Sequence, residues 1–162
     1  MLIAGAPATA AEITGTLPEP GVVWISDGSK PTPMSDASMK NAHKTFVPEL
    51  LVVTAGSNVR FPNEDPFYHS IYSESQRDPF DLGYYDMGPG KVVPFAQPGI
   101  VDVRCHVHQF MRATIVVVDG PWAQTAEPGQ TYTLRNVRPG QHRLHAWTPG
   151  GGEKISDVAV GS

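Results

Sequence analysis

Turn-forming residues divide this chain into short segments, and they restrict its fold more than any other feature. Sixteen glycines and sixteen prolines are spread over 162 residues. Between them apolar and polar residues alternate, as in Val59-Arg60-Phe61, which is the side-chain period of a strand with one buried face. Many short strands with almost no helical pattern predict an all-β sandwich.

The expected strands lie between Gly, Pro or Asn turns. The segment 114–118 reads TIVVV and, being apolar throughout, suits the centre of a sandwich. Residues 26–41 and 78–91 are rich in polar, Gly and Pro residues, so we expect loops there, with a brief helical turn in 35–42 as the only helix. The remaining strands are expected in 13–25, 46–61, 69–73, 92–95, 100–104 and parts of 121–162.

Composition excludes several classes of function. The formal net charge is −4 and the isoelectric point is about 5.8, so the chain lacks the basic surface that nucleic-acid binding needs. No apolar run reaches the length of a membrane-spanning helix. The single cysteine excludes an internal disulfide. We find no serine–histidine–acid arrangement in a recognisable context, no phosphate-binding glycine loop and no His-x-x-x-His helix.

The first residues are expected to lie outside the fold. Residues 1–12 read MLIAGAPATAAE, small and apolar, and Ala8-Thr9-Ala10 matches an A-x-A cleavage signal. We interpret this segment as a signal-peptide remnant or a disordered tail, although its first basic residue is as late as Lys30. The protein is therefore predicted to be periplasmic or otherwise exported. In such an oxidising location an idle free thiol is a liability, which makes Cys105 informative.

That cysteine lies in the segment 104–111, RCHVHQFM, between two predicted strands. The loop expected there carries a thiol at Cys105, an imidazole at His108 and a thioether at Met111, and a further imidazole, His69, lies upstream. Two imidazoles and one thiolate with a weak thioether ligand form a blue-copper site. The alternative is a buried, inert cysteine beside surface histidines, but the spacing and the strand context together favour the metal.

These residues resemble the copper loop of the cupredoxins. The motif Cys-x2-His-x2-Met-Arg is most similar to the loop of amicyanins, with pseudoazurins close, and Asn63-x5-His69 matches a strand that ends in Asn before the first histidine ligand. The resemblance implies a Greek-key β-sandwich that holds one copper ion, Cu(I)/Cu(II), on His69, Cys105, His108 and Met111. It also implies that Asn63 braces the ligand loops and hydrogen-bonds near the thiolate.

The resemblance further implies a mononuclear type 1 copper protein that carries one electron between redox partners, and not an enzyme. The expected partners are a c-type cytochrome or a dehydrogenase. In cupredoxins the C-terminal histidine ligand, here His108, emerges through an apolar patch that docks such partners. The residues expected to form this patch are Pro66, Phe67, Tyr68, Phe110 and Met111.

Other residues leave alternatives open. His106 is a second imidazole inside the loop, although the spacing places it outward. His43 and Glu49 precede the copper-domain strands, and an extra ligand from either would give a red or green site with an open coordination position, as in nitrosocyanin-like proteins. The chain would then be a copper enzyme or sensor, and a copper-binding or delivery module is a third interpretation.

The two ends of the chain are expected to form an accessory β unit. Residues 121–160 and 13–25 resemble Cna-B-like or carboxypeptidase-regulatory-like sandwich modules, and methylamine-utilisation cupredoxins also carry an added β segment. In the alternative, 13–25 supply the first strand of the copper domain. His142 and His145 are candidates for a second metal site. The expected division is 1–12 leader remnant, 13–30 N-terminal strands, 42–118 cupredoxin copper domain and 119–162 accessory β unit.

Overall fold

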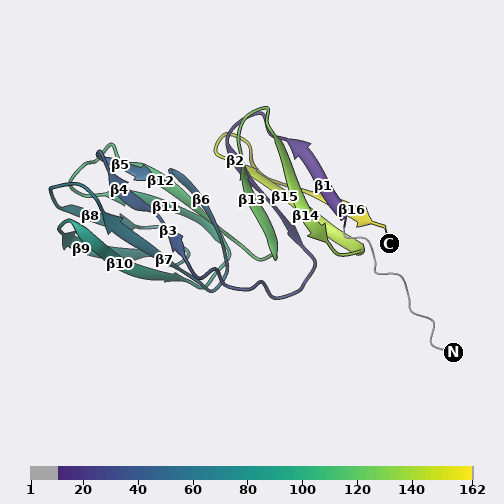
Figure 1. Ribbon diagram of the computed structural model, residues 1–162, viewed down its shortest axis with the longest axis horizontal. Helices are drawn as coiled ribbons and strands as arrows, with labels where there is room; N and C mark the ends of the chain where they lie inside the picture. Colours follow the sequence, from purple (N-terminus) through teal and green to yellow (C-terminus); the bar gives the residue numbers. More distant parts are fainter. Residues whose placement is uncertain (1–10, 162) are drawn as a thin grey trace. The chain divides into compact units, whose positions relative to one another are not determined.

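The computed structural model describes residues 11–161, and the chain divides into two compact units. The central unit comprises residues 30–121. The terminal unit is built from both ends of the chain, residues up to 29 and from 122 onward, so purple strands lie beside green and yellow ones in Figure 1. The predicted leader falls mainly outside the described residues, but Ala11 and Glu12 begin a strand. No helix that could cross a bilayer occurs between residues 11 and 161.

Two five-stranded sheets form the central unit. One sheet has the order β10-β7-β4-β5, with β3 also paired to β7, and the other has the order β6-β12-β11-β8-β9. All pairs are antiparallel except β3 and β4 with β7, and β6 with β12. The strands are β3 (Ala37–Ser38), β4 (Lys40–Ala42), β5 (Thr45–Val47), β6 (Leu50–Thr54), β7 (Ser57–Asn63), β8 (His69–Ser73), β9 (Phe80–Tyr85), β10 (Gly88–Phe95), β11 (Gly99–Cys105) and β12 (Arg112–Val118).

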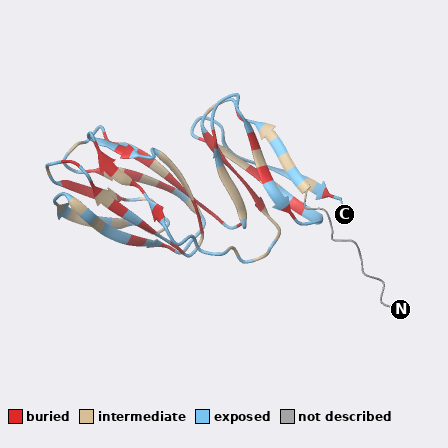
Figure 2. Cartoon of the chain, viewed as in Figure 1, coloured by how far each residue is buried: buried red, intermediate tan, exposed pale blue. Residues whose placement is uncertain are grey.

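Alternating burial explains how these strands form one core. In β7, Val59 and Phe61 are buried while Arg60 is exposed, as the sequence predicted. The apolar strand β12 lies between β6 and β11, away from the sheet edges. Figure 2 shows the resulting change from buried to exposed along the strands. Apolar side chains of both sheets meet in one cluster that includes Phe46, Phe61, Ile71, Phe95, Val103, Cys105, Met111 and Ile115.

Two of the predicted loops contain strands instead. The helical turn predicted in residues 35–42 is wrong, because Ala37 and Met39 alternate with more exposed residues and are buried beside β7, so that β3 and β4 form there. The compact unit therefore begins before residue 42, the expected boundary. The predicted loop 78–91 contains β9 and the start of β10.

The terminal unit also consists of two sheets around a core. The strands β1 (Ala11–Thr16) and β14 (Thr131–Val137) form one sheet, and β13-β2-β15-β16 form the other. The strand β2 lies between β13 and β15, so residues 13–25 form strands of this unit. Its likeness to the Cna-B-like or carboxypeptidase-regulatory-like modules stays a prediction. The strands of the second sheet are β2 (Gly21–Ser26), β13 (Trp122–Ala126), β15 (Gly140–Thr148) and β16 (Gly152–Val160).

Candidate metal centre

Three predicted ligand residues come together in the central unit. The ligand atoms of His69, Cys105 and His108 all lie within 4.8 Å of one another. His69 begins β8 and Cys105 ends β11, and these two strands are hydrogen-bonded neighbours, whereas His108 lies in the turn that follows β11. Within residues 11–161, no other group of three His, Cys, Asp or Glu side chains forms such a cluster.

The thiol of Cys105 is enclosed by the two histidines. Cys105 is 2% exposed and His69 is fully buried. The Sγ atom lies 3.7 Å from Nδ1 of His69, and the backbone amide of His108 donates a hydrogen bond to Sγ over 3.5 Å. The thiolate is the form of cysteine that binds metal, and this amide is aimed at the sulfur atom.

The tautomer of His69 follows from its second neighbour. Its Nε2 lies 2.9 Å from Oδ2 of Asp65, a side chain that is itself buried. Burial raises the pKa of Asp65, but hydrogen bonds from the Lys44 amide, His69 and the His43 amide outweigh this and lower it, so the carboxylate is ionised. An ionised carboxylate only accepts hydrogen bonds, so Nε2 carries the proton. The lone pair of Nδ1 then faces the cysteine sulfur.

One ring nitrogen of His108 is available to bind a metal ion. Its Nδ1 is buried and has no hydrogen-bond partner in the described part of the chain. Such an atom is costly unless something satisfies it, and a metal ion would do so. Burial, followed by the electrostatic influence of His69 and Lys44, lowers the pKa of His108 below its ordinary value of 6.5. The neutral imidazole, which is the metal-binding form, is thereby favoured.

Met111 and Asn63 lie close to this cluster in the chain. Met111 is 2% exposed in the same core cluster as Cys105, and its amide donates to the carbonyl of His108 over 2.9 Å, which closes the loop. Asn63 donates to the carbonyl of Phe67 over 2.8 Å, and so braces the segment that carries His69. Among the described hydrogen bonds of Asn63, none reaches the Cys105 loop.

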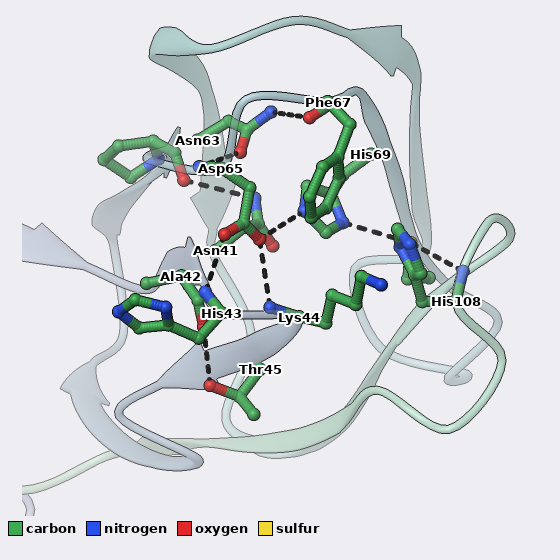
Figure 3. Close-up of polar contacts among 12 residues, drawn as sticks. Asn41, Ala42, His43, Lys44, Thr45, Asn63, Asp65, Phe67, His69 and His108 are labelled. Atoms are coloured by element: carbon green, nitrogen blue, oxygen red, sulfur yellow. Dashed lines mark hydrogen bonds and ion pairs between the residues drawn. The ribbon is translucent and has the colours of Figure 1, made fainter.

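The alternative ligands lie away from the cluster. The ring of His106 stacks on Tyr72 at 3.7 Å, and its Nε2 lies 3.3 Å from Oδ2 of Asp81 on the exposed surface. His43 is exposed, and Figure 3 shows its ring turned away from His69 and His108. Glu49 is exposed as well, and its backbone carbonyl accepts a hydrogen bond from the backbone amide of Thr114 in β12.

The two histidines of the terminal unit already have partners. His145 has Nε2 at 2.7 Å from the hydroxyl of Ser26 and Nδ1 at 2.8 Å from a carboxylate oxygen of Glu153. His142 has Nε2 at 2.6 Å from the carbonyl of Arg138, while its Nδ1 is buried without a hydrogen-bond partner among the described residues. Neither histidine belongs to a group of three potential ligands in residues 11–161, so the expected second metal site has no support. The contacts of His145 join separate strands, so only the strand register, and no sequence motif, could have indicated them.

Aromatic side chains surround His108. The ring of Phe67 lies 5.4 Å from the His108 ring and 5.5 Å from the His69 ring, and Phe110 lies 6.0 Å from His108. Phe110 is 69% exposed and Tyr68 is 53% exposed, as expected for an apolar patch. The fifth expected member is different, because the side chain of Met111 is directed into the core and is buried.

Comparisons with known proteins agree with the fold. No protein-family model and no curated protein matches the chain. The solved structure of a Cu-containing nitrite reductase (NirK) from Thermus scotoductus SA-01 matches with 24% identity and a TM-score of 0.50, over 59% of this chain and 25% of that chain. Our chain thus corresponds to only a quarter of the reductase.

Two smaller proteins match with lower scores. Amicyanin from Paracoccus versutus has 21% identity and a TM-score of 0.47 over 58% of this chain and 97% of its own. A purple cupredoxin from Nitrosopumilus maritimus has 19% identity and a TM-score of 0.46 over 51% of this chain and 100% of its own. The central unit has the cupredoxin fold, as the sequence predicted, and its His69–Cys105–His108 cluster is a candidate copper site.

Proposed function

We propose that this chain is an exported type 1 copper protein that carries single electrons between redox partners. The buried cluster of one thiol and two imidazoles supports the proposal, because this donor set suits copper. Nδ1 of His69, Sγ of Cys105 and a ring nitrogen of His108 would hold one ion, and the Met111 sulfur would be a further, weak ligand. The unpartnered Nδ1 of His108 fits such a ligand role.

Bound copper supplies a one-electron couple between Cu(II) and Cu(I). The protein's contribution is to keep the ligand atoms in place and to exclude water from them. The rigid β8–β11 pair fixes His69 and Cys105, which are at most 2% exposed, and the hydrogen bond between Met111 and His108 closes the remaining loop. A ligand set that moves little between oxidation states suits fast electron transfer.

The surroundings of His108 support a docking role for this end of the central unit. The exposed ring of Phe110 lies 6.0 Å from the ring of the partly exposed His108, as the electron exit of a carrier requires, and Tyr68 is a second exposed ring, next in the chain to Phe67. We propose that a c-type cytochrome or a dehydrogenase docks on this apolar patch through a small, transient interface.

Absorption and electron paramagnetic resonance spectra after addition of one equivalent of Cu(II) test the copper site. We expect an intense thiolate-to-copper band and a narrow hyperfine splitting, because sulfur shares the unpaired electron. The Cys105→Ser variant is the control, and it should lose the band. A pale spectrum with wide splitting in the unaltered protein would show that Cys105 is not a ligand.

Anion binding separates a carrier from an enzyme or sensor. His43, Glu49 and His106 are exposed and do not belong to the cluster, so we expect azide to leave the copper spectrum unchanged. A reduced protein should also transfer its electron rapidly to an oxidised c-type cytochrome. A new azide-dependent band would favour an open coordination position, and release of copper to an acceptor without electron transfer would favour a delivery module.

A further inference from the structure

Asp65 is a buried carboxylate that the copper-loop motif does not include. It lies between β7 and β8, four residues before His69, and is 4% exposed. Its Oδ1 accepts a hydrogen bond from the amide of His43 at 2.7 Å. Its Oδ2 accepts one from the amide of Lys44 at 3.0 Å and faces Nε2 of His69 at 2.9 Å. Figure 3 shows these contacts meeting at the one side chain.

The carboxylate is itself held in place. The backbone amide of Asp65 donates to Oδ1 of Asn63 over 2.9 Å, and Asn63 is 1% exposed. Asn63 also donates to the carbonyl of Phe67, two residues before His69. The segment from Asn63 to His69 is therefore fixed at both its acidic residue and its aromatic one. Because Asp65 has little freedom, it can orient the imidazole that it contacts.

The other two contacts reach a turn of unusual conformation. His43 and Lys44 join β4 to β5 with φ angles of 53° and 58°, in the left-handed region that residues other than glycine rarely adopt. The amides of both residues donate to Asp65. The carboxylate thus stabilises the turn and connects a hairpin of one sheet to a ligand that begins a strand of the other sheet.

We propose that Asp65 is the positioning residue of the metal centre. It fixes His69 with the proton on Nε2, so that the lone pair of Nδ1 is directed at the cysteine sulfur, and it ties this imidazole to the β4–β5 turn. The role in copper binding rests on the proposed function. The tautomer of His69 does not, because it is a property of the metal-free protein as well.

Only a carboxylate suits the three donors that meet here. An ionised carboxylate has two oxygens that accept and no proton to donate. An asparagine at this position would present an NH2 group to a backbone amide or to the imidazole. If the NH2 group faced His69, Nε2 would have to accept, and the proton would move to Nδ1, on the side where the metal should bind.

Nitrogen NMR of the metal-free, unaltered protein labelled with 15N-histidine gives the first test. We expect His69 at neutral pH to carry its proton on Nε2, with Nδ1 unprotonated. A proton on Nδ1 in the neutral ring would overturn the proposal. This measurement needs no variant, so it remains decisive even if substitution of Asp65 prevents folding.

The second test compares Asp65→Asn with Glu64→Gln. Glu64 is the adjacent carboxylate, 55% exposed and paired with Lys40 on the surface, so its substitution is a matched control. For Asp65→Asn we expect Cu(II) affinity to fall about 10- to 100-fold, a typical cost of losing the hydrogen-bond partner of a ligand histidine. We also expect an altered His69 tautomer in the metal-free variant. The control should match the unaltered protein in both respects.

The outcomes separate this proposal from the proposed function. If Asp65→Asn is folded and keeps both the tautomer and the copper affinity of the unaltered protein, Asp65 is not the positioning residue. If the unaltered protein gives the thiolate band but His69 is protonated on Nδ1 without metal, only this proposal fails. If the expected tautomer is found and copper gives no thiolate band, only the proposed function fails.

Discussion

Only Val107 separates His106 from His108 in the chain, yet the surroundings of the two imidazoles differ. The ring of His106 stacks on Tyr72 at the surface, while His108 lies in the cluster with Cys105 and has an unpartnered buried nitrogen. We expect His106→Ala to bind copper as the unaltered protein does. His108→Ala should bind it more weakly and with an altered spectrum. Titration with Cu(II), followed by paramagnetic resonance, checks both, and the reverse result would exchange their roles.

The lowered pKa of His108 predicts how the free energy of unfolding depends on pH. Burial lowers this pKa below 6.5, so near that pH the unfolded chain binds more protons than the folded protein does. The free energy of unfolding of the metal-free protein should therefore fall as the pH decreases from about 6.5 towards the folded pKa. Urea unfolding at several pH values measures this.

A substitution tests one of the smaller contributions to the lowered pKa of His108. The charge of Lys44 is one cause of the lowered pKa of His108. Lys44→Gln should raise this pKa, because one unfavourable charge is removed, and the protonation of His108 followed by NMR shows it directly. An unchanged pKa in Lys44→Gln would mean that the lysine charge does not reach the imidazole.

The three residues that cluster could be singled out from sequence, but Asp65 could not. His69, Cys105 and His108 follow from residue type and loop spacing, both of which are local. The stretch Asn63-Glu64-Asp65-Pro66 has the composition of an exposed turn. Asp65 is buried only because the turn at His43 and Lys44 folds against it from more than twenty residues earlier in the chain.

At the scale of elements, the core of the central unit depends on phenylalanine side chains from both of its sheets. Phe61 in β7 is fully buried and contacts the ring of Phe80 at 5.5 Å. We expect Phe61→Ala to lower the free energy of unfolding by about 3–5 kcal/mol, because it leaves a cavity that the sheets cannot close. Val92→Ala is the control on the neighbouring strand β10, where Val92 is 44% exposed. Equal losses in the two variants, measured by denaturant unfolding, would contradict this account of the core.

A largely buried strand was found from sequence, whereas a mostly exposed strand and a very short one were not. β8 was predicted with its observed bounds, whereas β16 was not recognised. Most positions of β16 are exposed, as expected of a strand with a partner on one side only, so burial imposes almost no pattern on it. β3 was missed because it has two residues, and its pairing with β7 is set by the partner strand.

At the scale of the whole molecule, the two units depend on different parts of the chain. All candidate ligands and the core around them lie within residues 30–121. Removal of residues 1–29 takes away β2, which lies between two partners in the terminal unit. We expect the truncated protein to keep its copper spectrum, while residues 122–162 become sensitive to proteases, as mapped by mass spectrometry. Loss of the copper spectrum would show that the central unit needs the N-terminal strands.

The position of β2 also has a consequence during synthesis. It leaves the ribosome before any part of the central unit, but its partners β13 and β15 are made only after it. Its first five residues are all buried in the finished protein, so a nascent chain exposes an apolar strand that has no partner yet. Because Ile25 pairs with Trp122, folding of the residues between them replaces a long flexible loop by a short connection and lowers the entropic cost of closing the sheet. A substitution that slows folding around the metal centre should therefore prolong the exposure of β2 and increase aggregation, even though it lies outside the terminal unit.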